Sequence, residues 1–165
     1  MTIAQSFLAE LHHEAAVTRK MLERVPFDRI TWQPHEKSMT LLRLSQHIAS
    51  LPIWIERTVS PDEFDLASIT YNPPVPKNVA DLIDEYNKNI KLAEEVLSKC
   101  SNEDLMKMWT LKRGDITFFT MPKTAAVRNL ALNHLVHHRG QLSVYLRLLD
   151  VPVPGAYGPS ADDIM

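Results

Sequence analysis

Apolar residues recur at helical spacing in four stretches of the chain. The first stretch is Ile3–Arg24, and the second begins at Ser38 or Thr40. The third follows Asn78, and the fourth is Pro122–Leu149. Apolar positions three and four residues apart place one buried stripe on each helix. Four such helices and almost no strand predict an all-α protein with a four-helix bundle fold.

The segments between these stretches lack helical periodicity. Ser60–Asn78 is rich in proline and acid and predicts a long loop between the second and third helices that is either mobile or a wall of a binding cleft. Trp109–Thr120 contains two short β-prone runs around Gly114, which predict a small hairpin or an irregular crossover before the fourth helix. Pro52 lacks an N–H group and should kink the second helix.

The fourth helix carries the sequence Asn-His-Leu-Val-His-His-Arg-Gly-Gln at positions 133–141. At about 100° per residue, His134 and His138 lie roughly 40° apart and can converge on one point. This spacing lets one helix supply two ligands to a transition metal. His137 lies about 60° from His134 on the other flank, so His134 with His137 is a competing pair. The alternative to either metal-binding pair is that these histidines simply form a solvated polar edge of the helix.

His47 lies within the apolar face of the second helix. A lone histidine on such a face is usually a core residue with a hydrogen-bond partner. If the second and fourth helices are neighbours, however, His47 faces the same interior as His134 and His138. Burying three imidazoles costs free energy, and a shared metal explains all three together. Three histidine ligands leave a coordination position open, which is typical of catalytic zinc, and without thiolate ligands nickel, iron or manganese also fits.

Composition limits the remaining possibilities. A length of 165 residues predicts a single domain over 1–165, and a net charge of −2 without a basic run argues against a nucleic-acid partner. The single cysteine, Cys100, excludes an internal disulfide and suits a reducing cytoplasm. We expect no signal peptide, because the first residues lack a basic lead and a long apolar run. No stretch approaches the ~20 apolar residues of a membrane span, so the expected location is cytoplasmic.

Three motifs resemble those of the DinB superfamily, the DinB/YfiT-like metalloenzymes named for damage-inducible proteins. The motifs are Leu-Ser-Gln-His-Ile-Ala at 44–49, Asn-His-Leu-Val-His-His-Arg-Gly-Gln-Leu at 133–142, and Pro-Gly-Ala-Tyr-Gly-Pro at 154–159. The resemblance implies a four-helix bundle that holds a divalent metal through His47, His134 and His138. It thereby selects His138 over His137. It also implies a homodimer, because family members are often homodimers.

The resulting functional prediction is a metal-dependent enzyme that acts on a small molecule. Zinc or nickel is favoured, with iron or manganese as alternatives, and the chemistry is hydrolysis or transfer of a low-molecular-weight thiol, which the resemblance implies. The thiol would be a cosubstrate, because Cys100 lies at a helix end without a ligand partner nearby in sequence. One alternative is a non-catalytic metal- or ligand-binding bundle with a stress-related role. Another is a DNA-damage effector that contacts nucleic acid, which the charge balance disfavours.

Residues around the histidines receive individual predictions. Gln141 and Tyr145 follow the same helical line as the candidate ligands. In one interpretation they orient a ligand histidine or a bound water. In the other they are ordinary core residues that bond to the backbone. Arg139 points away from the candidate ligand face, and we expect it to form a structural ion pair at the surface of the bundle or of a dimer. We expect Gly140 to allow a neighbouring helix to approach closely.

Apolar residues around the kinked second helix supply a reason from the sequence itself to expect a dimer. If they are exposed, a second copy of the chain would cover them. The residues are Ile53, Ile55 and Val59.

Overall fold

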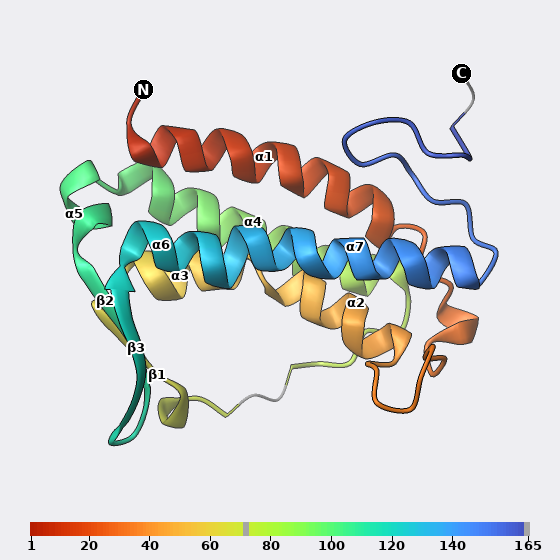
Figure 1. Ribbon diagram of the computed structural model, residues 1–165, viewed down its shortest axis with the longest axis horizontal. Coiled ribbons are helices and arrows are strands. Elements are labelled where there is room, and N and C mark those ends of the chain that lie inside the picture. The colour runs from red at the N-terminus through yellow and green to blue at the C-terminus, as the bar shows by residue number, and fades with distance from the viewer. Residues whose placement is uncertain (71–72, 164–165) are drawn as a thin grey trace.

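Helices dominate the computed structural model, which describes residues 1–70 and 73–163 (Figure 1). The α-helices are α1 (Ile3–Leu22), α2 (Leu41–Ser50), α3 (Ile53–Val59), α4 (Val79–Lys99), α5 (Asn102–Met106), α6 (Lys123–Val127) and α7 (Asn133–Leu148). Short 3-10 turns occur at η1 (Phe27–Arg29) and η2 (Leu66–Ser68), and a π-helical turn occurs at η3 (Arg128–Leu132). The strands are β1 (Glu63–Asp65), β2 (Met108–Arg113) and β3 (Ile116–Pro122).

The long helices form a bundle around one apolar interior. Thr2 and Asn78 cap α1 and α4, as their side chains accept hydrogen bonds from backbone N–H groups of the first turn. Helices α2 and α3 together occupy the place of one long helix (Figure 1). The predicted disruption at Pro52 is a full break between them, and the Asn89 amide of α4 donates a hydrogen bond of 2.9 Å to the Ala49 carbonyl beside it.

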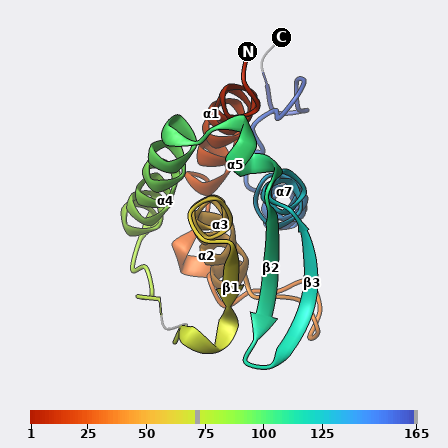
Figure 2. The ribbon, with the colours of Figure 1, turned by 90° about the vertical axis from the view of Figure 1, so that its left-hand side faces the viewer.

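The predicted all-α class is wrong, because a three-stranded mixed sheet packs at one end of the bundle (Figure 2). The predicted hairpin is present as antiparallel β2 and β3, and β1 pairs in parallel with β2. Strand β1 lies inside the segment predicted as a plain loop, of which residues 71 and 72 are outside the described part. A strand of three residues is too short to show periodicity, and its partner Thr110 lies far along the chain from Glu63.

Side chains from the helices fix this sheet. Trp109 of β2 is fully buried, and its indole N–H donates to the Arg57 carbonyl at 3.1 Å. The buried Lys123 ammonium donates to the Val59 carbonyl at 2.9 Å and pairs with Asp62, just before β1. The sheet is therefore tied to α3, and the correct class is α-rich with a small sheet.

The predicted fourth helix is a composite of α6, η3 and α7. In the π-helical turn the N–H group of Asn133 bonds to the carbonyl of Arg128, five residues earlier instead of four. None of the helices in the described ranges combines the length and apolar composition that crossing a bilayer requires.

Of the three apolar residues that suggested a dimer, two are buried and Ile53 is half-buried. Ile55 is fully buried and Val59 is 8% exposed, and both belong to the core with Leu11 and Leu97. That reason for a dimer is wrong, and the homodimer stays a prediction that rests on the family resemblance.

Candidate metal centre

Three imidazoles meet where α2 packs against α7. The Nε2 atoms of His134 and His138 are 2.9 Å apart, and those of His47 and His134 are 3.3 Å apart. One candidate ligand nitrogen from each ring lies within 4.8 Å of the other two. The structure thus brings together His47, His134 and His138 from positions almost ninety residues apart along the chain.

Local structure determines which way each ring points. Helix α2 starts at the Thr40 cap, whose hydroxyl accepts from the Arg43 N–H at 3.2 Å, and its apolar face includes the fully buried Leu44 and Ile48. His47 borders that face and is directed inward with it. His134 and His138 lie one turn apart on α7, as the four-residue spacing predicts.

Gln141 fixes the orientation of the His138 ring. Its Oε1 atom lies 2.7 Å from His138 Nδ1. An amide oxygen only accepts hydrogen bonds, so the neutral ring carries its proton on Nδ1 and keeps a lone pair on Nε2. The Gln141 Nε2 atom lies 3.2 Å from His137 Nε2, which explains why the amide presents its oxygen to His138. Of the two residues predicted to lie beside the ligands, Gln141 and Tyr145, Gln141 is the one that contacts a histidine of the cluster through a hydrogen bond.

Burial keeps the rings uncharged. The pKa of His47 is lowered to about 4, chiefly by burial and in smaller part by the neighbouring His138, His134 and Arg43. Burial also lowers the pKa of His134, partly offset by a hydrogen bond to the Leu130 backbone. Burial lowers the pKa of His138 as well, although the bond to Gln141 raises it in part. All three imidazoles are therefore neutral at pH 7, the form that coordinates metals.

The donor set fits a transition metal. Bonds of about 2.0–2.1 Å in a tetrahedral zinc site place ligand nitrogens roughly 3.3 Å apart, close to the separations among these rings. The roles of these facing nitrogens depend on the tautomer of each ring, and in the tautomers without a proton on Nε2 the lone pairs converge where a cation can bind. His137, by contrast, is exposed on the flank of α7.

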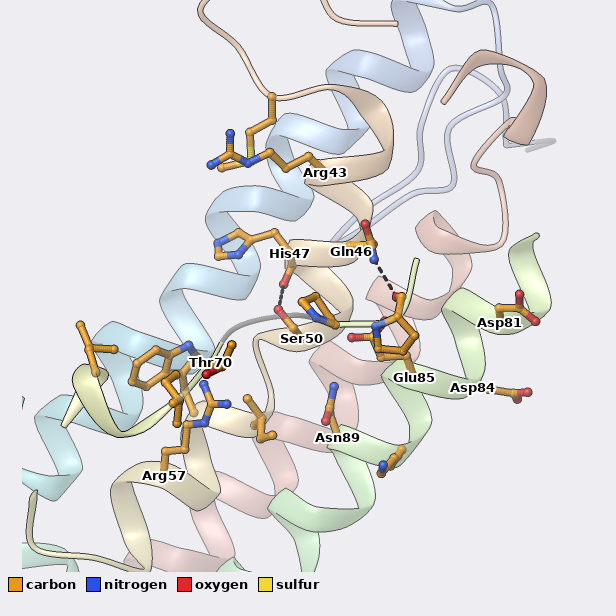
Figure 3. A pocket seen from close by; sticks show the side chains of 18 residues that line it. Arg43, Gln46, His47, Ser50, Arg57, Thr70, Asp81, Asp84, Glu85 and Asn89 are labelled. Atoms are coloured by element: carbon orange, nitrogen blue, oxygen red, sulfur yellow. Dashed lines mark hydrogen bonds between the residues drawn. The ribbon is translucent and has the colours of Figure 1, made fainter. Parts of the chain in front are cut away.

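A cavity of about 1010 Å³ adjoins the cluster through His47 (Figure 3). It is bounded by α2 and α3 on one side, by α4 on the other, and by the chain that follows β1. A cavity of this size accepts a small organic molecule. Of the two alternatives predicted for this loop, the structure agrees with the cleft wall, because Leu66, Ile69 and Pro74 line this space.

Two other predicted residues lie apart from the histidines. The Tyr145 hydroxyl donates to the Met39 carbonyl at 3.1 Å, and its ring meets Trp32 edge-on, so its recorded bonds are those of a core residue. Gly140 is exposed, and a Cβ atom there would meet nothing within 4 Å, so the predicted close helix approach is wrong.

Arg139 forms the predicted ion pair, but in the interior of the bundle. Its guanidinium bonds to the Glu14 carboxylate of α1 at 2.5 Å and to Thr18 Oγ1 at 3.2 Å. The Tyr157 hydroxyl accepts from Arg139 at 2.6 Å and donates to Glu14 at 3.0 Å. Sequence reasoning missed Glu14, although a carboxylate among the apolar positions of α1 was a detectable signal.

Comparisons with known proteins agree with this architecture. The chain is 25% identical over 162 residues to the Bacillus subtilis (strain 168) protein YrdA, covering 95% of this chain and 89% of YrdA. A DinB-like protein from Bacillus cereus ATCC 10987 superposes with a TM-score of 0.72 at 28% identity, covering 94% of this chain and 98% of the other. The DinB-like protein YjoA of Bacillus subtilis shares the fold, with a TM-score of 0.71 at 19% identity, covering 89% and 96%. The model of the DinB family matches residues 1–164, and this chain belongs to the DinB family.

Proposed function

We propose that His47, His134 and His138 bind a divalent transition metal, and that the protein is a metal-dependent enzyme acting on a small molecule in the adjoining cavity. The observation that carries the proposal is the convergence of three neutral imidazoles beside that cavity. Zinc or nickel is the favoured metal, and iron or manganese also suits an all-nitrogen donor set. When bound, such a metal supplies Lewis acidity, which lowers the pKa of a coordinated water or thiol.

The residues of the chain have distinct roles in this proposal. His47, His134 and His138 offer Nε2 lone pairs, and Gln141 holds the proton of His138 on Nδ1. The cavity beside His47 admits and orients the substrate. This open space favours an enzyme over a non-catalytic metal-binding bundle, whose metal site is typically closed.

Two reaction classes fit the site, namely hydrolysis and transfer of a low-molecular-weight thiol. A transferred thiol would have to come from a cosubstrate. Burial raises the pKa of the Cys100 thiol, and its Sγ atom points to the Ser101 carbonyl at the far end of α4, so this thiol is a poor nucleophile.

Metal analysis of the purified protein tests the proposal. Wild-type protein should retain about one divalent transition metal per chain after dialysis, and His47→Ala should lose it while keeping its helical circular dichroism spectrum. Ester substrates, and small thiols with electrophilic acceptors, are then screened with and without chelator. A wild-type protein that binds none of the four metals at micromolar concentration would overturn the metal site. Turnover unaffected by the chelator would overturn the metal-dependent mechanism.

A further inference from the structure

The two long walls of the cavity carry opposite net charges. The α2–α3 wall contributes the cations Arg43 and Arg57, whereas the α4 wall contributes three carboxylates and one cation, Lys88, and so is negative in sum (Figure 3). Arg43 and Arg57 flank His47 along the helical wall in this view. The carboxylates that line the cavity are Asp81, Asp84 and Glu85. An anionic group on a ligand is therefore attracted to the first wall and repelled by the second.

Arg57 is held in place by aromatic rings. Its guanidinium carbon lies 5.2 Å from the centre of the Trp54 ring and 5.0 Å from that of Phe64. The two rings meet edge-on with centroids 5.5 Å apart, and Arg57 itself is half-buried. A guanidinium fixed on aromatic faces keeps its planar donors aligned, so it loses little entropy when it binds a carboxylate with two parallel hydrogen bonds.

The surface next to Arg57 is apolar. Trp54 and Ile53 of α3 line it, as do Leu66 and Ile69 from the chain after β1. Arg57 belongs to α3 and His47 to α2, and the two side chains lie at separate places along this wall (Figure 3). A ligand that reaches from Arg57 to the histidines therefore needs an apolar body between its anionic group and its reacting group.

We propose that the cavity binds an amphipathic monocarboxylate, with the carboxylate on Arg57 and the apolar body against Trp54, Leu66 and Ile69. The apolar surface beside Arg57 and the net negative charge of the α4 wall favour this position for the carboxylate. Chemistry on this ligand rests on the proposed metal-dependent function, whereas its binding requires only the cavity.

Calorimetric titration of chelator-treated protein tests the binding mode. The probes are 4-phenylbutanoate and its neutral amide, which differ only in the group assigned to Arg57. Wild-type protein should bind the acid at least about tenfold more tightly, as expected for a charge-assisted contact. This ratio should fall close to one in Arg57→Gln. It should be unchanged in Arg29→Gln, a matched variant at an exposed arginine outside the cavity lining.

Several results would overturn the proposal. Equal affinity of wild-type protein for the acid and the amide removes the carboxylate site. Loss of the preference in Arg43→Gln but not in Arg57→Gln removes the assigned position, and tighter binding of 3-phenylpropyl phosphate than of the acid removes the carboxylate class. If Arg57→Gln does not fold, Arg57→Lys keeps the charge without the planar donors, and the ratio should still drop several-fold; an unchanged ratio contradicts the role of Arg57.

Zinc binding of the same proteins separates this proposal from the metal site. Arg57→Gln should bind zinc as wild type does, since it supplies no ligand nitrogen. An acid preference in a wild-type protein that fails to bind metal would overturn the proposed function and leave the carboxylate site standing. The opposite result would leave the metal site standing alone.

Discussion

Helix α7 presents two adjacent residues to two very different polar clusters. His138 faces α2 and meets His47 and His134, whereas Arg139 faces α1 and meets Glu14. Both clusters join α7 to another helix of the bundle, and both place side chains with polar groups at buried or half-buried positions. They differ in whether donors and acceptors match.

The arginine cluster is complete by itself. The guanidinium donates to Glu14, Thr18 and Tyr157, and the Tyr157 hydroxyl returns a bond to Glu14. The histidine cluster brings together only ring nitrogens, and which of them donates or accepts depends on the tautomer of each ring. Polar residues of one helix can therefore be separated into a structural set and a ligand-binding set by counting matched donors and acceptors.

Breaking the arginine cluster should give the largest loss of stability. Arg139→Leu leaves the Glu14 carboxylate buried without its cation, which should lower the free energy of unfolding by about 3–5 kcal/mol. Urea denaturation measures this loss, which should be the same with and without chelator. The double variant with Glu14→Leu should recover much of it. A loss that vanishes when metal is removed would show that the two clusters are not independent.

Removing a histidine of the cluster should cost stability only when metal is present. With metal at 100 times its dissociation constant, the wild-type protein gains about 2.7 kcal/mol, and His47→Ala, His134→Ala and His138→Ala should lose that gain. His137→Ala is the matched control and should keep it. Thermal unfolding with and without chelator provides the measurement. Loss of the gain in His137→Ala but not in His138→Ala would show that the wrong adjacent histidine had been assigned.

Gln141 sharpens the comparison, because it acts on the cluster through His138. Gln141→Ala should weaken metal binding by about 10–100-fold, as is typical when the partner of a ligand histidine is removed. Gln141→Glu retains an acceptor for the Nδ1 proton and should bind metal nearly as wild type does. Competition with a chromogenic chelator measures both. Equal weakening in the two variants would argue that Gln141 contributes only packing.

The metal-free histidine cluster should also respond to acid. Because the pKa of His47 is lowered from 6.5 to about 4, the unfolded chain binds a proton more readily than the folded protein over this range. The stability of chelator-treated protein should therefore be constant above about pH 6.5 and decline as the pH falls towards 4. His47→Ala should show a smaller decline in urea denaturation. An identical decline in both proteins would contradict the burial of a neutral His47.

Gly140 follows the two clustered residues and should have the smallest effect. It is exposed, and the space around its missing Cβ is open. Gly140→Ala should raise the free energy of unfolding by about 0.5–1 kcal/mol, because alanine restricts the unfolded chain. Metal affinity should not change. A loss of stability would indicate that this side of α7 is covered in solution.

Local spacing and apolar patterning predicted the elements that short stretches encode by themselves. The start of the third helix after Asn78, the disruption at Pro52, the hairpin after Trp109 and the spacing that lets His134 and His138 converge each depend on neighbours within a few residues. His47 was found because a polar ring on an apolar face needs a partner. Selecting His138 over His137 required the family resemblance.

Features that depend on contacts far apart in sequence could not be predicted in this way. Strand β1 exists because β2 offers it a free edge, and its three residues carry no pattern of their own. The partner of Arg139 lies on the first helix, and nothing near position 139 specifies it. The composition of the loop after β1 allowed a cleft wall, but which of its residues line the cavity depends on how it packs across α2 and α4.

The π-helical turn η3 has a consequence for how this centre could have arisen. Such a turn accommodates one residue more than an α-helical turn, and each residue rotates a helix by about 100°. Deleting a single residue there and restoring regular α-helix would therefore swing either α6 or all of α7 through that angle. If α6 stayed anchored by Lys123, His134 and His138 would turn away from His47 together. One inserted codon is thus enough to create or abolish the alignment of the three histidines, without any change to the histidines themselves.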